Sequence, residues 1–141
     1  MEISGQAAYP GVFAVRSCSY TCSHGISPGT ATLVCIEQTT PPAEEGDLII
    51  SDGPTTVRIP GCRVDNIKLI VGGGAERLWI ISLKDRRWRW VGYGSLGGCY
   101  NQLDPNGKLV PWLIRSPTEL AKLCLTQMNE QGYVLNLPSG L

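Results

Sequence analysis

Short runs of β-branched and aromatic residues, separated by turn sequences, occupy the chain as far as residue 91. Residues 12–23 and 30–36 are two such runs around the turn sequence HGISPG, and together they predict a β-hairpin. The prolines of residues 39–46, TTPPAEEG, exclude a central strand there, whereas DLIISDG predicts a short strand that ends in an Asp-Gly turn. Residues 55–74 predict a strand, a Pro-Gly break and a second strand.

Residues 77–91, RLWIISLKDRRWRWV, carry the strongest strand pattern, but their apolar face changes sides partway. The first half places apolar residues at odd positions from Trp79 to Leu83, whereas both tryptophans of the second half stand at even positions. Because side chains alternate strictly along a strand, the change predicts a bulge, a bend or a move to another layer near Lys84 to Arg86.

The spacing of apolar residues changes to a helical one in the C-terminal part of the chain. Ser116 and Glu119 are placed to form a reciprocal capping box, and Pro117 fits the first helical position, where a missing N–H costs nothing. The apolar stripe that follows at three-and-four spacing consists of Leu120, Leu123, Cys124 and Met128. Gly132 is placed to end this helix in a left-handed conformation, and residues 133–138, YVLNLP, predict a return to a strand.

These patterns together predict a mainly β fold, either a β-barrel or a strongly bent sheet. One amphipathic α-helix, over about residues 116–131, is expected to pack across one opening. A chain of 141 residues is long enough for one domain with its own core. We therefore expect a single β-rich domain over residues 1–141.

Charge and hydropathy exclude some classes of function. Lys plus Arg equals Asp plus Glu at 12 each, so no overall field attracts polyanions. No apolar run approaches the roughly 20 residues of a membrane span, and the N-terminus lacks the basic-then-apolar order of a signal peptide. We therefore expect a protein of cytosolic origin without a membrane partner. Its 6 cysteines stand largely in apolar patterns, which favours free thiols over a disulfide framework.

The first hairpin contains candidate zinc ligands. Cys18, Cys22 and His24 share a parity, and Cys35 on the partner strand could supply a fourth ligand. These positions lie in a strand pattern rather than in a zinc knuckle, and no second close cysteine pair is present. The pattern therefore favours small buried or half-buried side chains over a metal site.

Signals for catalysis are equally weak. His24 could serve as the base of a Cys-His enzyme, but the sequence contains no nucleophile elbow or cysteine-enzyme signature. Glu44, Glu45 and Asp47 lie in a polar segment that is typical of a solvated loop. The glycines of residues 72–74 and 94–98 lack the Lys-Ser/Thr or dinucleotide context of a phosphate loop. We therefore predict neither an enzyme nor a cofactor.

The densest cluster of functional side chains is DRRWRW, residues 85–90. Arginine and tryptophan are the residues most enriched in the energetic centres of protein interfaces, which makes a protein contact one use of this segment. Stacking aromatics beside a basic groove would instead bind single-stranded nucleic acid, for which a neutral chain offers only a fragment. The third use is structural, with the tryptophans in a core layer and Asp85 neutralising an arginine.

The order DG…V.IPGCRVDNIKLIVGGG…LWIISLKDRRWRW…GSLGGCYNQ…SPTELAKLCLTQM resembles the N-terminal part of the tail hub, or baseplate hub, proteins of tailed bacteriophages. The resemblance extends from about Tyr9 to Pro138. Its sharpest parts are the DRRWRW segment, the stretch from Gly94 to Asn101 and the capped helix that begins at Ser116. The candidate interface or core-organising residues are Asp85, Arg86, Arg87, Trp88, Arg89, Trp90, Tyr100 and Asn101.

The resemblance implies a structural role in the virion. Hub proteins of this family form a ring that connects the tail tube to the tail tip or spike and lets DNA pass through its channel. The implied partners are copies of the chain itself and the tail tube, distal tail, tip or spike proteins, with no sequence-specific nucleic acid. The implied location is the phage tail, after synthesis in the cytoplasm of the host bacterium.

Family hubs are several times longer, so the chain would be either a single hub-like domain or one part of a larger or split hub. The alternative function is a small β-barrel that binds single-stranded nucleic acid through Arg87, Trp88, Arg89 and Trp90.

Overall fold

The structure, a computed structural model, describes residues 2–25, 27–72, 74, 76–93, 96 and 100–130. The chain forms two compact units, residues 1–91 and residues 92–141, and each is considered by itself. The strand predicted over residues 133–138, the helix-ending Gly132 and most of the 94–98 glycine loop lie outside the described residues.

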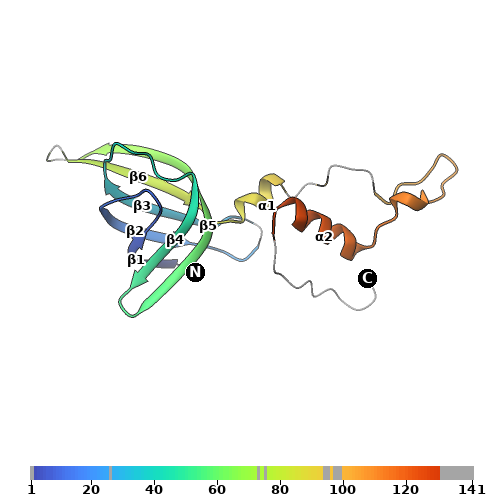
Figure 1. Ribbon diagram of the computed structural model, residues 1–141, viewed down its shortest axis with the longest axis horizontal. Helices are drawn as coiled ribbons and strands as arrows, with labels where there is room; N and C mark the ends of the chain where they lie inside the picture. Colours follow the sequence, from blue (N-terminus) through green and yellow to red (C-terminus); the bar gives the residue numbers. More distant parts are fainter. Residues whose placement is uncertain are drawn as a thin grey trace. The chain divides into compact units, whose positions relative to one another are not determined.

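The first unit is a closed barrel of six antiparallel strands, which confirms the predicted β-barrel (Figure 1). Around the barrel the strands follow the order β1-β2-β3-β6-β5-β4, and β4 pairs with β1 to close it. The strands are β1 (Glu2–Ala8), β2 (Val15–Thr21), β3 (Thr30–Ile36), β4 (Glu45–Asp52), β5 (Thr55–Val71) and β6 (Arg77–Lys84). The predicted hairpin of residues 12–23 and 30–36 is confirmed as the antiparallel β2–β3 pair.

Alternate residues of the strands fill the barrel. On β3, Ala31, Leu33 and Cys35 are buried while the residues between them are more exposed. Leu33 lies opposite Ile81 of β6, and both side chains are fully enclosed. The remaining buried residues of this core are Tyr9, Cys18, Tyr20, Leu48, Ile50, Ile59, Cys62 and Leu83. The strict alternation explains why the strand pattern was legible in the sequence.

Residues 55–71 form one long strand, so the prediction of two strands separated by a break is wrong. Strand β5 pairs with β4 along its first part and with β6 along its second. At the predicted break the register to β4 shifts between Gly46 and Leu48, and Gly61 takes a left-handed φ of 62°. The Pro-Gly pair therefore makes a bulge that bends the strand around the barrel without ending it.

The strand predicted to continue to residue 91 ends earlier. Strand β6 stops at Lys84, and helix α1 (Trp88–Tyr93) follows. Asp85 ends the strand because its carboxylate Oδ1 accepts the backbone N–H of Arg87 at 3.1 Å and its carbonyl accepts that of Trp88 at 3.0 Å. The predicted change of face near Lys84 is thus the end of the strand, and DRRWRW is a turn and a short helix.

The second unit contains helix α2 (Pro117–Gln127), which begins as predicted with a capping box between Ser116 and Glu119. It ends earlier than predicted, because Asn129 takes the left-handed conformation at φ 54°. The Asn129 and Glu130 N–H groups donate to the carbonyls of Thr126 and Leu125, the two hydrogen bonds of a Schellman motif. Asn129 therefore ends the helix in the left-handed conformation that the sequence predicted for Gly132.

In the described part of the chain, none of the helices has the length and hydropathy of a membrane span.

Candidate functional site

Asp85 is the centre of a buried polar network on the first unit. Its side chain is nearly enclosed, and its carboxylate Oδ2 accepts the Tyr20 hydroxyl at 2.8 Å and the Gly29 N–H at 3.0 Å. The Arg87 guanidinium pairs with the same oxygen at 2.8 Å. Arg87 also donates to the carbonyls of Ser23 and Gly25 at 2.9 and 3.0 Å. The network therefore ties the β2–β3 connection to the end of β6.

Ionisation in this network follows from its contacts. Burial by itself would raise the pKa of the Asp85 carboxyl, but the hydrogen bonds from Arg87, Tyr20 and Gly29 outweigh it and hold that pKa below its ordinary value. Burial, together with the hydrogen bond to Asp85, raises the pKa of the Tyr20 phenol well above its usual range. Asp85 is thus a carboxylate and Tyr20 a neutral donor at neutral pH.

The ring of Trp88 contacts two arginines. The guanidinium carbons of Arg63 and Arg89 are 4.7 and 5.3 Å from the centroid of its ring, and its indole N–H donates to the Gly61 carbonyl at 3.2 Å. Each of these arginines also forms an ion pair, since Arg63 contacts Glu44 at 2.7 Å and Arg89 contacts Glu45 at 3.0 Å. The whole arrangement attaches helix α1 to strands β4 and β5 of the barrel.

Two of the three acidic residues predicted to lie in a solvated loop belong to a strand instead, so the prediction is wrong for Glu45 and Asp47, whereas Glu44 precedes the strand and is exposed. Glu45 and Asp47 belong to strand β4, and each pairs with an arginine of another element. Asp47 accepts the N–H of Gly61 at 3.0 Å and pairs with Arg58. The Gly61 hydrogen bond, followed by the Arg58 contact, lowers the Asp47 pKa. Asp47 thereby fastens the bulge of β5 to β4.

Replacing Trp88 with leucine should lower the free energy of unfolding by about 2–3 kcal/mol, because two cation–π contacts and one hydrogen bond are lost together. Trp88→Phe, which keeps a ring but removes the indole N–H, should cost about 1 kcal/mol. Urea denaturation of both variants measures these differences. A Trp88→Leu variant as stable as the natural chain would show that the stacking contributes nothing.

Tyr100 and Asn101 belong to the second unit. Asn101 has a left-handed φ of 53°, and its side chain bridges to Arg115, accepting that residue's N–H at 2.7 Å and donating to its carbonyl at 3.0 Å. These bonds close a hairpin whose tip is the Asp104 to Gly107 turn. Asn101, an exposed residue, therefore links the two ends of this hairpin within its own unit, and its role as an interface or core-organising residue stays a prediction.

Two of the three candidate zinc-ligand cysteines lie in the barrel core, and Cys22 packs against it. Cys18 and Cys35 are buried, and burial raises the pKa of both thiols, that of Cys18 to about 11. The five cysteines among the described residues are free thiols. Within the described part of the chain, no three His, Cys, Asp or Glu side chains lie close enough together to hold a metal ion. Protonated core thiols are poor nucleophiles and poor metal ligands.

Sequence reasoning found the Asp85 to Trp90 segment but missed its partners. Tyr20 and Gly29 hold Asp85, while Glu44, Glu45 and Arg63 surround Trp88 and Arg89. Their one visible signal is the presence of two acidic residues around the start of β4, Glu44 and Glu45, which indicates pairing with arginines only once the strand order is known.

Comparisons of the chain with protein-family models, with curated proteins and with solved structures found no match.

Proposed function

We propose that the chain is a ring subunit of a bacteriophage tail hub, connecting the tail tube to the tail tip through protein contacts. The sequence resemblance to hub proteins, which centres on DRRWRW and the capped helix, supports the tail assignment. The observation that carries the assembly role is an exposed apolar stretch at the far end of β5.

This stretch consists of Ile67, Leu69, Ile70 and Val71, with exposed fractions of 38, 43, 37 and 66%. Beyond Val64, strand β5 pairs with β6 on one side, and no described strand pairs with its other side. An unpaired strand edge with apolar side chains offers both backbone hydrogen bonds and apolar area to another protein. Such an edge favours assembly.

The arginines of the candidate site favour assembly over the nucleic-acid alternative. Arg63, Arg87 and Arg89 each form an ion pair within the chain, with Glu44, Asp85 and Glu45 respectively. A guanidinium that already pairs with a carboxylate must give up that pair to bind a phosphate. Trp88, which contacts Arg63 and Arg89, is likewise half-buried.

The test is the size of the full chain by mass photometry across a concentration series, alone and with the tail tube protein of the same phage. We expect closed rings or a complex of fixed stoichiometry. Leu69→Lys should reduce the assembled fraction at least about tenfold, because a charge replaces buried apolar area. Thr32→Lys is the matched control, since it adds the same charge at an exposed position of β3.

A chain that stays monomeric in both series would contradict the proposal. Equal assembly of Leu69→Lys and Thr32→Lys would show that the far end of β5 is not the contact. Binding to single-stranded DNA that weakens steeply with rising salt would instead support the alternative function.

A further inference from the structure

The barrel has a cavity where strand β1 changes partners. Residues Glu2 to Gly5 pair with β2, whereas residues Gln6 to Ala8 pair with β4. The start of β1 therefore separates from the hairpin formed by the end of β4 and the start of β5. The space between them has a volume of about 430 Å³. Ligand cavities in proteins span roughly 300–1,000 Å³, so this one suits a small ligand.

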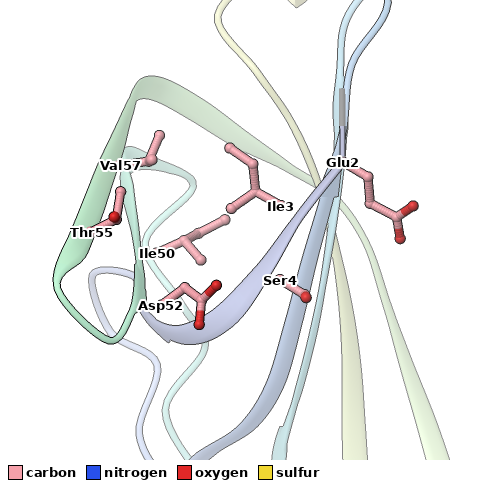
Figure 2. Close-up of a pocket in the computed structure, with 7 residues that line it drawn as sticks. All are labelled: Glu2, Ile3, Ser4, Ile50, Asp52, Thr55 and Val57. Atoms are coloured by element: carbon pink, nitrogen blue, oxygen red, sulfur yellow. The ribbon is translucent and has the colours of Figure 1, made fainter.

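The cavity has an apolar floor and a polar rim. Ile50 is fully enclosed, and Ile3 and Val57 pack against the barrel core. Figure 2 shows Ile3 and Ile50 in the middle of the lining residues, with Val57 beside them. The exposed polar residues around this floor are Glu2, Ser4, Asp52 and Thr55. In Figure 2 the Asp52 carboxylate lies below Ile50, whereas Glu2 points away from the floor.

The two acidic residues of the rim differ from the other carboxylates of the barrel. Among the described residues of the first unit, every other Asp and Glu forms an ion pair with an arginine or lysine: Glu37, Glu44, Glu45, Asp47, Asp65, Glu76 and Asp85. Asp52 and Glu2 have no such partner among the described residues. Two uncompensated negative charges therefore flank the mouth of an apolar cavity.

We propose that this cavity binds an organic cation, an ammonium group on an apolar stem, with the stem on Ile3, Ile50 and Val57 and the ammonium at Asp52. The hydroxyl of Thr55 is a further acceptor at the rim. Glu2 adds negative potential at the mouth without reaching the floor. An anion would meet repulsion, and a metal ion would find one carboxylate above an apolar floor rather than a set of ligands.

The test is a titration of the full, isotope-labelled chain, followed by the amide NMR signals of residues 2–4 and 50–57. The probes are n-hexylammonium, n-hexanol and hexanoate, which share a stem and differ in charge. We expect saturable shifts with n-hexylammonium, at least about tenfold weaker binding of n-hexanol, and no binding of hexanoate. Equal binding of n-hexylammonium and n-hexanol, or no saturable shift with n-hexylammonium, would overturn the proposal.

Variants locate the site. Asp52→Asn should weaken n-hexylammonium binding at least about tenfold, and Glu2→Gln should weaken it less. Asp65→Asn is the matched control, because it makes the same change on a carboxylate that pairs with Lys84 on another part of β5. Val57→Phe should abolish binding by filling the cavity, and its spectrum shows whether the barrel is intact. Unchanged binding by Asp52→Asn or by folded Val57→Phe would overturn the proposal.

The cation can come from a free amine or from a lysine side chain of another protein. Titration with Nα-acetyl-lysine methylamide beside n-hexylammonium distinguishes these sources. Tighter binding of the lysine compound supports a protein side chain as the natural ligand, and tighter binding of n-hexylammonium supports a free amine. These results do not depend on whether the chain forms rings, so the two proposals fail separately.

Discussion

Replacing Asp85 with alanine should lower the free energy of unfolding by about 3–5 kcal/mol, which makes it the most destabilising single change at the candidate site. The substitution leaves the Arg87 guanidinium, which is largely buried, without its carboxylate, and it removes the acceptor of the Tyr20 hydroxyl and the Gly29 N–H. Tyr20→Phe is the matched control, because it removes one hydrogen bond of the same network and should cost about 1 kcal/mol. Thermal or urea denaturation measures both.

The same network predicts how stability depends on pH. The Asp85 pKa is lower in the folded chain than its ordinary value of about 3.9 in an unfolded chain. The unfolded chain therefore binds a proton first as the pH falls, so the contribution of Asp85 is complete above that value and is lost below it. The stability difference between the natural chain and Asp85→Asn should shrink as the pH falls through this range. A difference that stays constant down to acid unfolding would contradict the assignment.

Replacing Gly5 with alanine should cost about 3 kcal/mol, the second largest effect, because it forces apart the strands that close the barrel. A Cβ on Gly5 would lie 2.4 Å from the Ser51 carbonyl oxygen, and that atom belongs to the backbone of β4. To relieve this clash, β1 would have to move away from β4. The clash lies where β1 changes from pairing with β2 to pairing with β4.

The control for this change is Gly92→Ala in helix α1. A Cβ at Gly92 meets no atom within 4 Å, and alanine favours a helix more than glycine does, so this variant should be as stable as the natural chain or slightly more so. Differential scanning calorimetry compares the two. A Gly5→Ala variant that unfolds at the natural temperature would show that the barrel closes without this close approach.

Sequence periodicity predicted the parts of the fold in which local pattern and burial agree. The alternation of apolar residues along β3 and β6 predicted these strands correctly, because one face of each strand points into the core. The capping box at Ser116 could be predicted because a helix start is a local arrangement of a few neighbouring residues. The same holds for the position of the change near Lys84, where the parity of the apolar residues breaks.

Tertiary contacts decided what local pattern left open. Pro60 and Gly61 look like a break in sequence, yet β5 continues through them because Asp47 binds the Gly61 N–H. DRRWRW looks like a strand, yet it turns because the Asp85 carboxylate binds residues far along the chain and the N–H of Arg87.

For the candidate site, too, the sequence determined one part and the tertiary structure another. The sequence by itself determined that arginine and tryptophan gather in residues 85–90, since that is composition at adjacent positions. Only the tertiary structure decided that Glu44, Glu45 and Arg63 meet them, because the order of strands β4, β5 and β6 around the barrel brings these residues together. Alternation along a strand reports which face is buried, whereas the identity of the neighbouring strand depends on how the whole barrel closes.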